Sequence, residues 1–164
     1  MTLSQELQHT LEVRAGLADV WSLLWDIRAL AGCLLGCENV VAVVEGKSYQ
    51  AEVRRKVAMF SIRFVLNIEV IDTQPGRSIG LVISGRDKRL KSEIQQKLVV
   101  QLEAIDPDLS RIDIATTINI SGLLASLGKH LVAMQFAQVV EDFAANMSAA
   151  IEQRASQGAV NESR

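Results

Sequence analysis

Apolar and polar residues alternate along most of the chain between residues 5 and 120, which is the pattern of β-strands that bury one face. One strand is predicted at residues 5–14, and about six more follow between residues 40 and 120. The turns between them are short and contain glycine, aspartate or proline, which favours hairpins and therefore an antiparallel sheet. Because the alternation is regular, we expect one face of the sheet to be buried and the other to face water.

Two stretches have helical spacing instead. After Ala15–Gly16, an apolar stripe predicts a short helix, and a second short helical piece follows from Arg28 to Leu35. Residues 121–154 contain no proline and predict one long helix with an apolar side. The predicted fold is α+β, with a curved antiparallel sheet of about seven strands around a long C-terminal helix and two short helices after the first strand.

A space for a ligand is expected between the sheet and the long helix, because a curved sheet meets a straight cylinder along a line. The residues expected to line this cavity point inward from the strands or lie on the apolar side of the helix: Tyr49, Val53, Phe64, Leu66, Ile83, Leu98, Val100, Thr116, Ile118, Val132, Phe136, Val139 and Phe143.

The first turns of the long helix carry a second apolar stripe on the side that becomes polar further along. Its members are Leu123, Leu127, Leu131 and Met134. We expect these four residues to be partly exposed in a monomer, where they would form a cavity mouth or contact a partner chain or a second copy.

The composition is that of one ordinary folded domain. The chain has 164 residues and a formal net charge of −2, so nothing draws it as a whole toward nucleic acid. No apolar run approaches the ~20 residues of a membrane span, and the first residues do not resemble a secretory signal. We expect one domain at residues 5–154, a flexible tail at 155–164, and a cytoplasmic location.

Neither a metal site nor a cofactor is predicted. Cys33 and Cys37 stand four residues apart, but a zinc site needs four ligands and the chain's other candidates include only two histidines, His9 and His130. A half-site completed by a partner and a redox pair are the functional interpretations. We favour buried or partly buried free thiols.

Catalysis has little support in the sequence. The inward polar residues are few, and neither a nucleophile with a base nor an inward pair of carboxylates occurs among them. These residues are His9, Tyr49, Arg55, Gln96 and Thr116. We therefore predict no catalytic residue and expect a binding protein, with a cyclase- or hydrolase-like enzyme that uses these inward groups as the alternative. Thr116 and Gln96 could instead simply satisfy backbone groups.

Basic residues gather in two regions of the predicted sheet. They are Arg54, Arg55, Lys56, Arg63, Arg86, Lys88, Arg89 and Lys91, of which Arg54, Lys56 and Arg63 are expected to share the wet face. Docking to an acidic partner or a membrane surface is the functional interpretation. An ordinary solvated face is favoured, because Glu52, Glu69 and Glu93 lie among these charges.

Three segments stand out along the predicted elements: Ala18–Asp26 (ADVWSLLWD), Leu30–Glu38 (LAGCLLGCE) and Ser121–Gly128 (SGLLASLG). On these segments the chain resembles the CoxG family of carbon monoxide dehydrogenase proteins, within the START-like (SRPBCC, helix-grip) superfamily. The likeness covers about residues 7–150. Two positions depart from the family pattern: Leu35 replaces a common proline, and the charged Arg86–Lys91 replaces a glycine-rich strand.

The resemblance implies an accessory protein of a molybdenum-containing hydroxylase of the carbon monoxide dehydrogenase kind. It also implies an apolar cavity for a lipid-like or quinone-like molecule and a peripheral position at the inner membrane surface. Because the superfamily includes enzymes as well as lipid carriers, the fold by itself does not decide between these functions.

Overall fold

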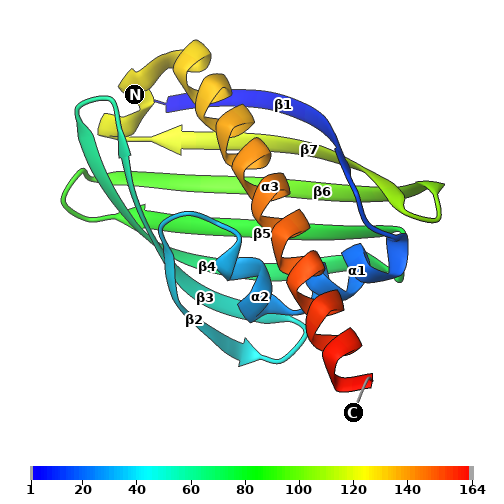
Figure 1. Ribbon diagram of the computed structural model, residues 1–164. Coiled ribbons are helices and arrows are strands. Elements are labelled where there is room, and N and C mark those ends of the chain that lie inside the picture. The colour runs from blue at the N-terminus through cyan, green and yellow to red at the C-terminus, as the bar shows by residue number, and fades with distance from the viewer. Residues whose placement is uncertain (1, 163–164) are drawn as a thin grey trace.

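The computed structural model describes residues 2–162, with side chains described to residue 156. All seven strands form one antiparallel sheet in the order β1-β7-β6-β5-β4-β3-β2 (Figure 1). The elements are, along the chain, β1 (Thr2–Val13), α1 (Leu17–Trp25), α2 (Ile27–Gly32), β2 (Cys37–Val44), β3 (Ser48–Val57), β4 (Phe60–Gln74), β5 (Ser78–Asp87), β6 (Ser92–Asp106), β7 (Leu109–Ser121), the 3₁₀-helix η1 (Leu123–Leu127) and α3 (Gly128–Glu162).

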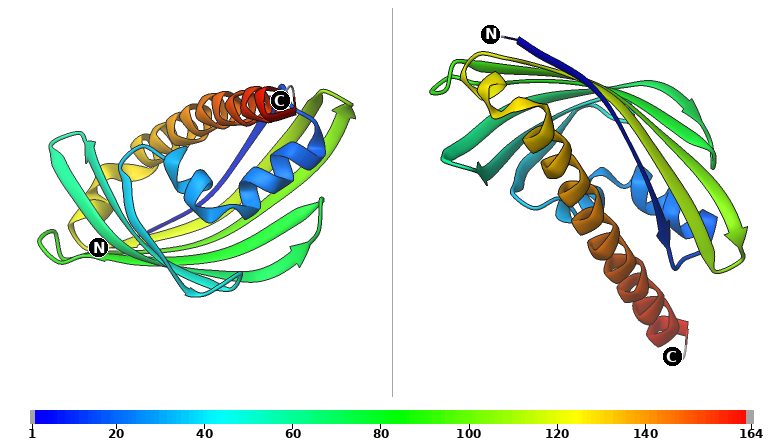
Figure 2. Two further views of the ribbon diagram at one scale, coloured as in Figure 1. Left: turned by 60° about the horizontal axis from the view of Figure 1, so that its bottom comes forward. Right: turned by 90° about the horizontal axis from the view of Figure 1, so that it is seen from above.

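The sheet curls around one side of α3, and α1 and α2 lie on the same concave side (Figure 2). α3 crosses this side and runs closest to β1. The predicted α+β architecture is therefore confirmed, including the two short helices after the first strand.

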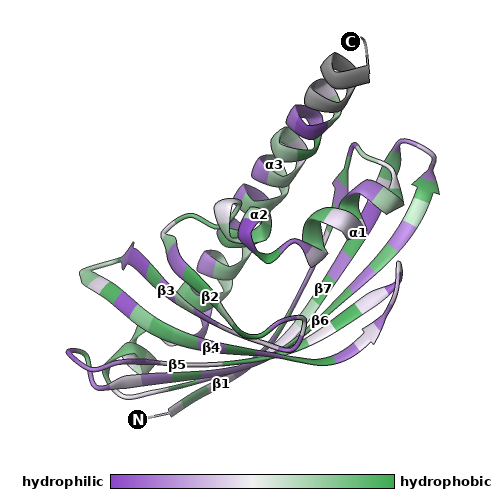
Figure 3. Cartoon of the chain, turned by 90° about the horizontal axis from the view of Figure 1, so that it is seen from below, coloured by the Kyte–Doolittle hydropathy of each residue, from purple (hydrophilic) through white to green (hydrophobic). Residues whose placement is uncertain are grey.

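Alternation along the strands separates the concave face from the outer face, as green and purple alternate in Figure 3. β7 is the clearest case, because Ile112, Ile114, Ile118 and Ile120 are buried while Thr117 and Asn119 between them are exposed. The register pairs Arg54 directly with Arg63, and both side chains are exposed on the outer face, as the sequence predicts. β1 begins at Thr2, so the first strand is longer than expected.

The expected start of the long helix is wrong. Ser121 still pairs in β7, Leu123–Leu127 form the separate helix η1, and α3 begins at Gly128. Gly122 and Gly128 flank η1, both with φ of 83°, a conformation that only glycine adopts easily. At its other end α3 continues to Glu162, into the stretch expected to be a tail. The flexibility of residues 155–164 stays a prediction, and residues 163 and 164 lie outside the described chain.

The buried side chains form two clusters against different parts of α3. One cluster joins the C-terminal half of α3, through residues such as Phe143 and Met147, to α1 and one end of the sheet. The other joins Val132 and η1 to the opposite end of the sheet, including Phe64 and Ile120. The middle of the concave face lies between the two clusters.

Candidate functional site

Strand pairing places inward residues of six strands in one row across the middle of the concave face. From β1 to β3 the row reads Gln5, Ile118, Gln96, Ile83, Ile68 and Tyr49. Because paired residues in an antiparallel sheet point to the same face, all six side chains face α3 rather than the outer side.

The residues expected to line a cavity fall into three sets. Five are buried core residues of the two clusters: Phe64, Ile118, Val132, Val100 and Phe143. Leu66, Leu98 and Phe136 are half-buried at the edges of those clusters. Val53, Ile83 and Val139 are half-buried and belong to neither cluster, and Tyr49 and Thr116 are buried outside both.

The hydroxyl groups of Tyr49 and Thr116 are used by the backbone. The Tyr49 hydroxyl accepts a hydrogen bond from the Gly46 N–H at 2.8 Å, in the β2–β3 turn. The Thr116 hydroxyl donates to the Lys97 carbonyl at 2.9 Å. Thr116 therefore satisfies a backbone group, which is the structural role considered for it from the sequence.

The proposed inward catalytic groups do not come together. Tyr49 lies on β3 and Thr116 on β7, with β4, β5 and β6 between them, which separates them by roughly 19 Å at the usual strand spacing. His9 lies on β1, opposite Ile114, at the far side of the sheet from Tyr49. These three residues cannot act on one substrate atom, so an enzyme built on them is not supported.

Gln5 is an inward polar residue that the sequence interpretation missed. It is partly buried on β1, and its Oε1 atom is buried without a hydrogen-bond partner among the described residues. The alternation of β1, continued two residues before Leu7, would have placed it on the apolar face. Gln5 and Gln96 lie in the same row, two strands apart.

Cys33 and Cys37 are free thiols on different elements. Cys33 is buried at the end of α2, whereas Cys37 opens β2, with Gly36 between them at a positive φ. Burial raises the pKa of both thiols, against a smaller lowering by Arg154 at Cys33 and with a further raising by Glu38 at Cys37. Burial therefore disfavours the reactive thiolate, and the structure matches the free-thiol interpretation.

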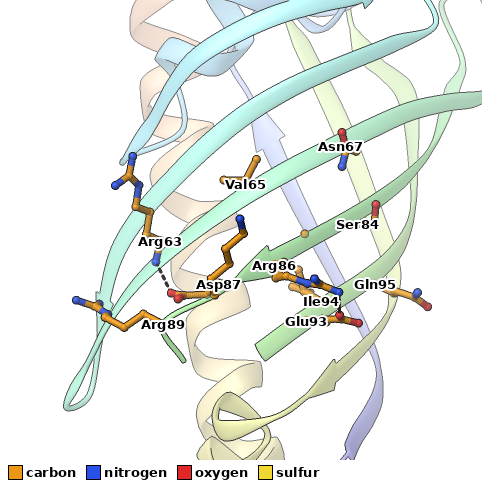
Figure 4. Close-up of a pocket in the computed structure, with 12 residues that line it drawn as sticks. Arg63, Val65, Asn67, Ser84, Arg86, Asp87, Arg89, Glu93, Ile94 and Gln95 are labelled. Carbon is orange, nitrogen blue, oxygen red and sulfur yellow. Dashed lines mark hydrogen bonds and ion pairs between the residues drawn. The ribbon is translucent and has the colours of Figure 1, made fainter. Parts of the chain in front are cut away.

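A hollow of about 800 Å³ lies on the outer face, over β4, β5 and β6 (Figure 4). Its lining is polar and largely charged, with Asn67, Ser84 and Gln95 in its middle. Two of its arginines are already paired: Arg63 with Glu52 at 3.3 Å, and Arg86 with Glu93. This hollow is therefore no site for an apolar molecule.

Asp87, at the rim of that hollow, is an internal hydrogen-bond acceptor. It is 2% exposed and accepts from the backbone N–H of Arg63 at 2.8 Å and of Leu90 at 3.1 Å. Burial alone would raise the pKa of Asp87, but these two hydrogen bonds and the nearby Arg89 outweigh burial and hold the pKa below its ordinary value.

A second hollow, of about 540 Å³, lies between α2 and the C-terminal half of α3. Polar contacts hold its two walls together. The Asn146 side chain donates to the Cys33 carbonyl at 3.1 Å, and Arg154 pairs with Asp26 at 2.5 Å. Neither hollow lies between the middle of the sheet and α3.

The expected exposure of the second apolar stripe is confirmed. Leu123 and Met134 are 51% and 54% exposed, and Leu127 and Leu131 are half-buried. Within residues 2–162, no three histidine, cysteine or acidic side chains gather as a metal site would need. None of the helices described here is long and apolar enough to cross a membrane.

Comparison with known proteins adds a family and a fold. The family model for the CoxG protein of carbon monoxide dehydrogenase matches residues 10–152. No curated protein matches the chain.

Three solved structures share the fold at low sequence identity. A conserved protein from Geobacillus kaustophilus is 20% identical with a TM-score of 0.84, over 91% of this chain and 96% of its own. A START superfamily protein from Mycobacterium smegmatis is 14% identical, with a TM-score of 0.70 over 90% and 97% of the chains. The Zhui aromatase/cyclase from Streptomyces sp. R1128 is 16% identical, with a TM-score of 0.59 over 94% and 95%. These likenesses show a START-like fold.

Proposed function

The chain belongs to the CoxG family of carbon monoxide dehydrogenase proteins, and on this premise we propose that it is a non-catalytic binding module for a lipid-like or quinone-like molecule. The ligand would lie on the concave side of the sheet, under α3. Cytoplasmic accessory service to a molybdenum hydroxylase of the carbon monoxide dehydrogenase type is the second part of the proposal, supported by the family alone.

The observation that carries the ligand site is an apolar surface that the core does not use. Ile68 and Ile83 face inward from neighbouring strands, Val53 and Val139 face the same space, and all four are half-buried outside both core clusters. Inward apolar side chains that stay partly accessible are the walls that an apolar ligand needs. Full burial of such walls by a ligand would add hydrophobic stabilisation of ~25 cal/mol per Å².

Two amides could orient the polar end of the ligand. Gln5 presents a buried oxygen without a donor among the described residues, and Gln96 lies two strands away in the same row. A ligand hydroxyl or a bound water would satisfy the Gln5 oxygen, because a buried unpaired acceptor is costly. Few polar groups in an apolar pocket are typical of small-molecule sites.

A pair of adjacent residues tests the site. Ile83 faces inward, and its neighbour Val82 is exposed on the outer face of β5. The variant Ile83→Trp should fill the proposed space and weaken the binding of menaquinone or a long-chain fatty acid at least about tenfold. Val82→Trp adds the same side chain on the other face and should leave affinity unchanged.

Binding would be measured by fluorescence titration of the purified protein, after organic extraction and mass spectrometry of the co-purified molecules. Failure to find or bind any apolar ligand would contradict the proposal, as would equal loss of affinity in both tryptophan variants. Co-purification with a molybdenum hydroxylase from the native organism tests the accessory role separately.

A further inference from the structure

One end of the molecule gathers the basic residues. The register places Val65, Arg86, Glu93, Ser121 and Thr2 in one line across β4, β5, β6, β7 and β1. Beyond that line lie the β3–β4 turn, the β5–β6 turn and η1, side by side at the left of Figure 1. We call this the hairpin end and define it as residues 54–64, 86–92 and 121–140.

The charge of the hairpin end is opposite to that of the rest of the chain. It carries nine lysine and arginine residues and one acidic residue, whereas the other 126 residues carry eight basic and 18 acidic residues. A net charge of −2 for the whole chain therefore conceals a strongly basic end and an acidic remainder. Such a separation orients a protein in front of a negatively charged surface.

The single carboxylate of the hairpin end does not offset this charge on the surface. Asp87 is buried and occupied by the backbone N–H groups of Arg63 and Leu90. Lys56 at the first turn and Lys88 and Lys91 at the second have exposed side chains, and no ion pair is recorded for them among the described residues.

Apolar side chains project from the same end. Met59 lies at the tip of the β3–β4 turn and is 85% exposed, the highest exposure among the large apolar residues described. Leu123 on η1 and Met134 on the first turns of α3 are also exposed. These side chains project from turns and helix surfaces, so they could enter a soft surface without a matching pocket.

We propose that the hairpin end docks on the surface of an anionic lipid bilayer, with Met59 and Leu123 inserted among the headgroups and the surrounding lysines against the lipid phosphates. Exposed apolar groups inside a ring of basic side chains are the combination that interfacial membrane binding requires. This inference does not depend on whether the concave side holds a ligand.

The same observations speak against a second copy of the chain as the partner at this end. A symmetric pair would bring two basic ends together, which like charges oppose. An acidic protein would satisfy the lysines but would leave Met59 in water unless it supplied a matching pocket. A bilayer satisfies both features at once.

Vesicle sedimentation of the purified full-length chain tests the proposal. The protein should bind phosphatidylcholine vesicles that contain about 30% phosphatidylglycerol, bind vesicles of phosphatidylcholine alone far more weakly, and lose most binding at about 1 M salt. The double variant Lys56→Glu/Lys88→Glu should weaken binding by roughly 25-fold or more, about fivefold for each lost charge.

Matched variants at the opposite end provide the controls. Arg77→Glu, in the β4–β5 turn, makes the same kind of charge reversal and should have a much smaller effect. Met59→Ser should weaken the binding that remains at moderate salt, whereas Ile105→Ser, an exposed apolar residue near the β6–β7 turn, should not.

Three results would overturn the proposal. They are no preference for anionic vesicles, equal effects of the variants at both ends, and self-association of the chain that the Lys56→Glu/Lys88→Glu variant abolishes. Circular dichroism of each variant checks that loss of binding is not loss of folding.

Discussion

Asp87 shows how one side chain can close a strand edge. β4 begins before its partner β5 can reach it, so the backbone of its first residues lacks strand partners on that side. The Asp87 carboxylate takes the Arg63 N–H, and the Arg89 guanidinium donates to the Ser61 carbonyl. The β5–β6 hairpin therefore stabilises β4 through side chains where no ladder exists.

Asp87→Asn should lower the free energy of unfolding at neutral pH by about 1–3 kcal/mol, because an amide can accept through only one of its two terminal atoms. The pKa of Asp87 is lowered in the folded state. Its stabilisation is therefore full above the ordinary aspartate pKa of about 3.9 and disappears as the pH falls through the lower folded-state pKa.

Urea unfolding between about pH 7 and about pH 2 would measure this difference. The variant should lose less stability on acidification than the parent chain over the acidic part of this range. Asp72→Asn, a change of an exposed carboxylate on the same strand β4, should follow the parent curve. Parallel curves for Asp87→Asn and the parent would show that the Asp87 carboxylate contributes nothing.

At the scale of elements, η1 is joined to the β5–β6 hairpin by close packing and by Ser92. The buried Ser92 hydroxyl donates to the Leu90 carbonyl and accepts from the Leu124 N–H, both at 3.0 Å. Gly122 lies against the same hairpin so closely that an added Cβ would stand 1.9 Å from the Lys91 carbonyl oxygen. This contact explains why the chain leaves β7 sharply and begins α3 late.

Gly122→Ala should therefore destabilise the protein by about 3 kcal/mol or more, through both backbone strain and overlap with Lys91. Gly46→Ala provides the comparison, since Gly46 also has a positive φ, of 77°, but open space around its Cβ position. That variant should cost only the strain, about 1–2 kcal/mol. Thermal or urea unfolding would rank them, and equal losses would mean that the close approach is relieved by a backbone shift.

At the scale of the whole molecule, the inward apolar residues differ in what they pack against. Ile112 is fully buried within one core cluster, whereas Ile83 is half-buried and belongs to neither cluster. If the middle of the concave face is a ligand wall, its side chains contribute less to folding than core side chains of the same size.

The same substitution at both sites tests this. Ile112→Ala should lower the free energy of unfolding by about 3–4 kcal/mol, since it leaves a cavity in packed core. Ile83→Ala should cost about 1 kcal/mol, because part of that side chain already contacts the open space. Ligand-free protein should be used for both measurements. A large loss at Ile83 would place it in the core and count against the proposed ligand wall.

Much of the architecture could be read from one dimension. Alternation assigns inward and outward faces wherever one sheet face is buried, so the order of elements, the outer-face positions of Arg54 and Arg63, and the inward direction of Thr116 were predictable. The same rule, applied two residues earlier, would have found Gln5.

What only the tertiary structure decided is which distant residues meet. Periodicity reports the face of a residue but not its neighbours across the sheet, so the separation of Tyr49 from Thr116 and the use of both hydroxyls by backbone groups could not be foreseen. The break at Gly122 depends on the approach of Lys91 from another hairpin. The gathering of basic residues at one end likewise needed the register, because charges far apart in the sequence become one surface only when the strands pair.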